Sequence, residues 1–132
     1  MGLLEDHLNL VYSVSDGLAT EQFYGDILGL ERMADIDLPG DRRMIRYLGG
    51  KSELKFIVAG QDQPRMEGGM RNARGIRLLA LLLPENRRAG ILERMQAAGL
   101  AAPEFAEGNR GPISFSYGMT RDYDDNQVEL VF

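Results

Sequence analysis

The chain has 132 residues, of which 44% are hydrophobic and 27% charged, and it contains no cysteine. This length is typical of one globular domain, and the hydrophobic content excludes a disordered chain. Without cysteine there are no disulfides, thiolate metal sites or cysteine nucleophiles, which agrees with a cytoplasmic location. No apolar leader opens the chain, and its longest apolar run, Leu78 to Leu83, is too short to span a bilayer. The sequence therefore predicts no membrane partner.

The net charge of −5 disfavours nucleic acid as a partner, because a surface that binds phosphate backbones is normally basic. Thirteen of the fifteen basic residues are arginines. Arginine suits bidentate contacts with small anions, and Arg65, Arg71 and Arg74 lie in one irregular stretch. This pattern points to an anionic group on a ligand, although a compositional bias toward arginine explains it equally well.

The first half predicts the order β-α-β-β-β. Alternating apolar residues over His7–Val14 indicate a strand with one buried face. Ser15 and Asp16 are favoured helix N-caps, and Gly29 is a favoured helix end, so a helix is predicted between them. The predicted strands that follow are Leu30–Ile36, Arg43–Leu48 and Glu53–Val58, the last two joined at Gly49-Gly50.

The second half repeats this order. Ile76–Leu83 is strongly apolar, which predicts a strand buried on both faces or nearly so. A helix is predicted over Pro84–Ala98 with Ala89, Leu92 and Met95 on its buried side. The remaining predicted strands are Ala101–Ala106, Ile113–Arg121 and Gln127–Phe132.

This internal repeat predicts a single α+β domain over residues 1–132. Module 1 covers about 5–60 and module 2 about 75–132, with a connecting loop at 59–75. One module alone cannot cover a four-stranded sheet with a second layer, so we expect the modules to pair, either within one chain or across a homodimer.

Two stretches carry a resemblance to a known family. Val14-Ser15-Asp16, Phe23-Tyr24 and Leu28-Gly29-Leu30 form the first, and Asp122–Leu130 forms the second. Together they resemble the vicinal oxygen chelate superfamily, which includes glyoxalases, bleomycin resistance proteins and extradiol dioxygenases. The second stretch departs from the family pattern at Tyr123, in place of proline, and at Asp125, in place of the turn glycine. The resemblance implies two βαβββ modules that form a curved mixed sheet, shaped like a cup.

In metal-dependent members of this family, the ligands come from the first and last strands of the modules. Counting back from Asp16 places the first-strand position at Asn9, and the equivalent positions in the other three strands correspond to Lys55, Leu78 and Glu129. Only Glu129 is a carboxylate, whereas a divalent ion usually takes three or more histidine or carboxylate ligands. The ligand count therefore favours the absence of a divalent metal over its presence.

A second interpretation places the ligand positions of two strands two residues earlier. The metal ligands would then be His7, Glu53 and Glu129, and the ion would be Zn, Ni, Mn or Fe. His7 and Glu53 are equally compatible with ordinary exposed side chains. In a site without metal, Lys55 could supply the counter-charge that an inward-facing Glu129 needs.

The resemblance implies a small-molecule site in the cup and leaves two functions open. In the first, favoured by analogy with the fold, the protein is a metal-dependent lyase, isomerase or dioxygenase with Glu129 as ligand or catalytic base. In the second, it binds or sequesters a small molecule, such as an antibiotic, without metal. The ligand-binding residues would be Asn9, Val11, Lys55, Ile57, Leu78, Ala80 and Leu82.

Overall fold

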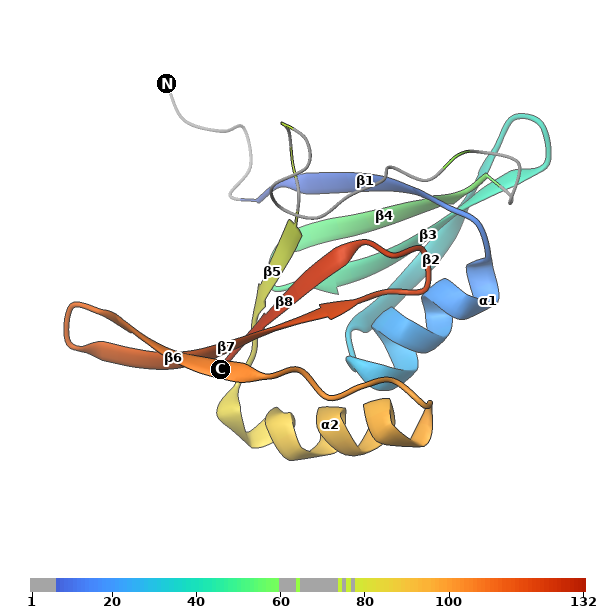
Figure 1. The fold of residues 1–132 in the computed structure, drawn as a ribbon. Helices are drawn as coiled ribbons and strands as arrows, with labels where there is room; N and C mark the ends of the chain where they lie inside the picture. The colour runs from blue at the N-terminus through green and yellow to red at the C-terminus, as the bar shows by residue number, and fades with distance from the viewer. Residues whose placement is uncertain (1–6, 60–63, 65–73, 75, 77) are drawn as a thin grey trace, which may run out of the picture. The chain divides into compact units, whose positions relative to one another are not determined.

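A computed structural model describes residues 7–59, 64, 74, 76 and 78–132. The chain divides into two compact units, Met1–Pro64 and Arg65–Phe132. Each unit has the order βαβββ and one four-stranded mixed sheet, so the predicted α+β class and element order are confirmed (Figure 1). None of the helices in the described part of the chain is long and apolar enough to cross a membrane.

Unit 1 contains the sheet β1-β4-β3-β2, in which β1 is parallel to β4 and the other neighbours are antiparallel. Its strands are β1 (Asn9–Val14), β2 (Glu31–Leu38), β3 (Arg42–Gly49) and β4 (Ser52–Val58). The β3–β4 hairpin turns at Gly50, which has a φ of 63° that glycine adopts without strain. The predicted glycine turn is therefore confirmed.

Unit 2 has the equivalent order β5-β8-β7-β6, again with a parallel first pair. Its strands are β5 (Leu78–Leu82), β6 (Phe105–Arg110), β7 (Ile113–Arg121) and β8 (Gln127–Val131). Asp122 organises the turn before β8, because its carboxylate accepts bonds of 2.9–3.0 Å from the backbone N–H groups of Asp124 and Asn126 and from the Asn126 side chain. Asp125 takes a left-handed φ of 67° in place of the family's glycine.

The helix of unit 1 begins at Asp16, whose Oδ1 accepts from the backbone N–H of Leu18 at 2.9 Å. A short α-helix, α1 (Gly17–Thr20), continues directly into a π-helix, η1 (Glu21–Ile27). The wider turn buries two adjacent columns of large side chains. These are Phe23 with Ile27 and Tyr24 with Leu28.

The two helices end in related turns that differ by one residue. In unit 1 the N–H of Leu30 donates to the carbonyl of Tyr24, and in unit 2 the N–H of Leu100 donates to the carbonyl of Met95. The first bond spans six residues and the second five, as expected if the π-helix holds one additional residue in its last turns. The turns contain Gly29 and Gly99, with φ of 71° and 76°.

Two predictions about burial in unit 2 were wrong, the first for one face of β5 and the second for Ala89 of the helix. β5 is buried on one face only, since Leu79 and Leu81 are covered while Leu82 is 80% exposed. The unbroken apolar run carries no alternation that could have revealed this. In α2 (Arg88–Ala97), which follows the 3-10 turn η2 (Glu85–Arg87), Met95 is buried as predicted and Leu92 is half-buried, but Ala89 is exposed and Ile91 is the second buried residue.

A cluster of charged side chains joins η1 to the sheet of unit 1. Arg32 contacts Glu21 at 3.0 Å and Asp35 at 2.6 Å, and Arg43 contacts the same two carboxylates at 3.2 and 3.0 Å. Arg32 also donates to the Tyr47 hydroxyl at 3.0 Å. A register shift in β2 between Met33 and Ile36 accompanies this arrangement.

Replacing Asp35 with asparagine removes its ion pairs with Arg32 and Arg43. The free energy of unfolding should fall by only about 1 kcal/mol at pH 7, because solvent partly screens each of these pairs. Burial alone would raise the pKa of Asp35, but Arg32 and Arg43 hold it below its ordinary value. The contribution is therefore present above the unfolded pKa of about 3.9 and is lost as the pH falls through the lower folded value.

Urea unfolding of both proteins at pH 7, 4 and 2.5 would measure this difference. Asp37→Asn is the matched control, because Asp37 lies exposed on the same strand and has no ion pair among the described residues. A wild-type advantage that stays constant down to pH 2.5 would contradict the assignment to the Asp35 carboxylate.

Candidate functional site

Each sheet has one face that packs against the helix of its own unit and a second face, here called the far face. In unit 1 the helix side includes Phe56, which packs against Tyr24 with ring centroids 4.4 Å apart. In unit 2 Arg88 of α2 donates to Ser116 of β7 at 2.9 Å. Because side chains alternate along a strand, the positions adjacent to these lie on the far faces.

The strand register shows that the two far faces are built from equivalent positions. In unit 1, Asn9 pairs with Glu53 and Val11 with Lys55 across the parallel strands. In unit 2, Leu78 pairs with Gln127 and Ala80 with Glu129. Lys55 and Glu129 therefore occupy the same place in the two repeats, as do Asn9 and Leu78.

On the far face of unit 1, three charged side chains form one group. The Glu53 Oε2 atom lies 3.5 Å from Nη1 of Arg46 and 3.6 Å from Nζ of Lys55. All three side chains are largely buried, with exposed fractions of 18–23%. Arg46 and Lys55 are direct cross-strand neighbours, so two positive charges share one carboxylate oxygen.

The far face of unit 2 is mainly apolar. Glu129 is half-buried on the middle strand, beside Ala80 on β5 and Met119 on β7. Within the described part of unit 2, nothing makes a hydrogen bond or ion pair with the Glu129 carboxylate. A carboxylate in such a place is a natural partner for a donor group on a ligand.

The other predicted site residues are placed as follows. Asn9, Val11 and Ile57 lie on the far face of unit 1, with Val11 58% exposed, and Leu78, Ala80 and Leu82 lie on the far face of unit 2. His7 is half-buried and precedes β1. Arg65 and Arg71 lie outside the described residues, and Arg74 is exposed. The pairing of Lys55 with Glu129 and the shared site of the two modules stay predictions.

The donors of unit 1 do not fit a divalent metal. The Glu53 carboxylate already contacts two cations, so a metal bound there would lie beside an ammonium and a guanidinium group. The equivalent first-strand positions offer only the amide of Asn9 and the alkyl side chain of Leu78. Among the described residues, no group of three or more histidine or acidic side chains is suited to hold a metal ion.

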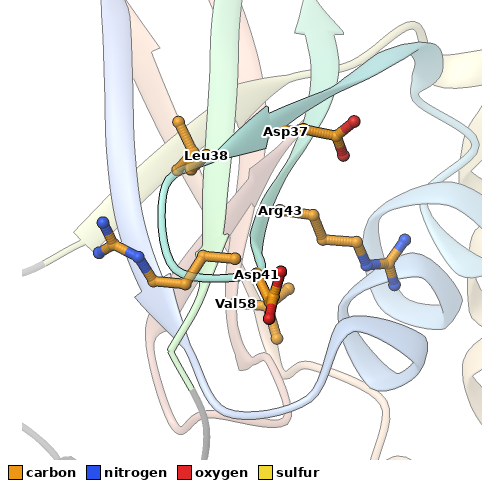
Figure 2. Close-up of a pocket in the computed structure, with 6 residues that line it drawn as sticks. Asp37, Leu38, Asp41, Arg43 and Val58 are labelled. Carbon is orange, nitrogen blue, oxygen red and sulfur yellow. The ribbon is translucent and has the colours of Figure 1, made fainter.

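A separate pocket of about 550 Å³ lies at the β2–β3 hairpin of unit 1 (Figure 2). Its lining residues are Asp37, Leu38, Asp41, Arg42, Arg43 and Val58. Figure 2 shows the Arg43 side chain reaching toward the helix, where it contacts Glu21. None of the site residues predicted from the sequence lines this pocket.

Arg46 is the residue of the charged group that the sequence analysis missed. A signal for it exists in the hairpin itself. Counting outward from the Gly49–Ser52 pair places Leu48 opposite Glu53 and Arg46 opposite Lys55. The turn prediction at Gly49-Gly50 thus contained enough information to bring Arg46 to the site.

Comparison with solved structures shows the same fold in several proteins of low sequence identity. A glyoxalase family protein from Enterococcus faecalis matches with a TM-score of 0.65 and 18% identity, covering 99% of this chain and 97% of that one. Lactoylglutathione lyase from Agrobacterium tumefaciens matches with a TM-score of 0.58 and 21% identity, covering 94% and 90%. A variant of the fosfomycin resistance protein FosX from Listeria monocytogenes, solved with Mn(II), matches with a TM-score of 0.57 and 18% identity, covering 92% and 87%.

No family model and no curated protein matches the sequence. The structural matches, which also include a glyoxylase/bleomycin resistance protein/dioxygenase domain from Frankia sp., nevertheless confirm the fold that the residue motifs predicted.

Proposed function

We propose that this protein binds a small organic molecule on the far faces of its sheets and does so without a metal ion. The observation that supports this is the chemistry of the four positions from which the fold's metal-dependent members supply ligands. Here they hold Asn9, Lys55, Leu78 and Glu129, so only one carboxylate stands where a divalent ion needs several donors.

The contacts of Glu53 argue against the hypothesis that His7, Glu53 and Glu129 bind a metal ion. Its carboxylate is engaged by Arg46 and Lys55, and a metal would have to displace both cations from it. The far faces instead combine exposed apolar side chains, such as Val11 and Leu82, with a few polar groups. Apolar walls with a few polar groups are the usual composition of small-molecule sites.

Protein purified without a metal-chelating tag should contain far less than one equivalent of divalent metal per chain. Its melting temperature should not change on addition of EDTA, Zn, Ni, Mn or Fe(II), because metal binding to the folded state would raise it. Elemental analysis and thermal unfolding provide the measurements. Near-stoichiometric metal that disappears in Glu129→Ala would overturn the proposal and favour the metal-dependent enzyme.

A neutral replacement at Glu129 gives an internal control for this experiment. Glu129→Gln should leave the melting temperature unchanged or slightly raised, because the carboxylate has no partner in the described part of unit 2 and is half-buried. A ligand found by screening should bind this variant more weakly than the wild type. Both results together would show that the Glu129 carboxylate contributes to ligand binding rather than to the stability of the fold.

A further inference from the structure

We propose that Arg46 and Lys55 bind an oxyanion, so that the ligand of this protein carries a carboxylate or phosphate group. This inference rests on the proposed function and specifies the class of its ligand. The two cations lie on adjacent strands, directly opposite each other, on the far face of unit 1. Like charges placed in this way repel each other and destabilise a sheet unless an anion lies between them.

Glu53 compensates only one of the two positive charges. Both cations approach the same oxygen, at 3.5 and 3.6 Å, which is longer than the 2.7–2.9 Å typical of strong charge-assisted hydrogen bonds. The other nearby carboxylate on this face, that of Glu31, is exposed and makes no ion pair with either cation. The group therefore keeps one positive charge that no described side chain neutralises.

Several donors of this group also have no acceptor. A guanidinium has five N–H groups and an ammonium three. Arg46 uses Nε for the carbonyl of Ala34, at 2.9 Å, and directs Nη1 at Glu53. The remaining guanidinium N–H groups, and those of the ammonium not directed at Glu53, meet no acceptor among the described residues.

The surroundings of the cations strengthen their attraction for an anion. Val11 adjoins Lys55 on one side, and Met33 adjoins Arg46 on the other. The charged side chains are themselves only 18–23% exposed, so water screens them incompletely. A small oxyanion bound here would accept hydrogen bonds from both cations at once.

Inorganic phosphate and acetate are suitable probes, titrated into the full chain at constant ionic strength and followed by backbone amide NMR. We expect saturable shifts at and around Arg46 and Lys55 with at least one probe. The preferred probe distinguishes a phosphate from a carboxylate ligand. Failure of both to give saturable shifts would overturn the inference.

Single substitutions test the two cations. Arg46→Met and Lys55→Met should each weaken binding of the probe at least tenfold, whereas Arg46→Lys and Lys55→Arg, which keep the charge, should weaken it only a few-fold. The matched controls are Lys51→Met, at the exposed turn of the same β3–β4 hairpin, and Arg110→Met, at an exposed position on β6 of unit 2, and these should bind as the wild type does. Equal losses in the charge-conserving and methionine variants would overturn the assignment.

Glu53→Gln should change the affinity for the probe in the opposite direction. Removing the internal carboxylate should tighten binding of the probe several-fold, because the anion no longer competes with Glu53 for the two cations. Unchanged or weakened binding would contradict the inference. A neutral ligand that binds metal-free protein, and whose affinity Lys55→Met and Arg46→Met do not change, would overturn this inference alone and leave the proposed function intact.

Discussion

Replacing Phe56 with alanine should lower the free energy of unfolding by about 3–5 kcal/mol, the usual cost of truncating a large aromatic side chain in a core. Phe56 is fully buried at the centre of unit 1. Its ring lies 5.4 Å from that of Tyr12, 4.4 Å from Tyr24 and 6.4 Å from Tyr47. The substitution therefore removes contacts with two strands and the π-helix together. Urea unfolding followed by circular dichroism measures the loss.

Leu18→Ala is the matched control, because Leu18 belongs to the helix of the same unit but is 73% exposed. It should change stability by less than about 0.5 kcal/mol, as most surface substitutions do. A Phe56→Ala loss below about 1 kcal/mol would contradict the packing described for unit 1.

Replacing Gly118 with alanine should destabilise the protein by about 1–3 kcal/mol through overpacking. A Cβ atom at this position would lie 2.8 Å from Cβ of Pro103 and 3.0 Å from the ring of Phe105. Pro103 is buried and its ring has no rotamer that moves it away, while Arg88 lies over the Phe105 ring, 4.2 Å from its centroid. Relief of the contact therefore requires movement of the backbone.

Gly108→Ala is a closely matched control in the neighbouring strand. Its Cβ would also meet an aromatic ring, that of Phe115, at 2.7 Å. Phe115 is only half-buried and can rotate toward solvent. We expect this variant to be neutral, or more stable by about 0.4–1 kcal/mol because alanine restricts the unfolded chain. Equal losses in both variants, measured by thermal unfolding, would show that the Pro103 contact is unimportant.

The sequence predicted most of the fold because its local signals were strong. Asp16 before the helix, the glycine after each helix and the Gly49-Gly50 turn each have a physical cause that acts within a few residues. The alternation was correct within β1, where Val14 is buried and Val11 is exposed, but Leu8 at the start of the predicted strand is 58% exposed. Such signals do not depend on the rest of the chain.

Two features were not predicted, although the residues that form each of them lie close together in the sequence. The π-helix was missed because the spacing of Phe23, Tyr24, Ile27 and Leu28 is equally compatible with an α-helix. The contact of Arg46 with Glu53 was missed because the strand register, which places Arg46 opposite Lys55, was not counted outward from the predicted Gly49-Gly50 turn. A candidate site made of far-face side chains is therefore harder to predict than the elements that carry it.

The π-helix of unit 1 also means that the two repeats are unequal in how they are held together. It buries Phe23, Tyr24 and Ile27, and its last turn buries Leu28, whereas α2 buries only Ile91 and Met95. The two units therefore share one topology but have different interiors. Substitutions at matching positions of the two halves are not equivalent experiments, and the tolerance measured in one half cannot be transferred to the other.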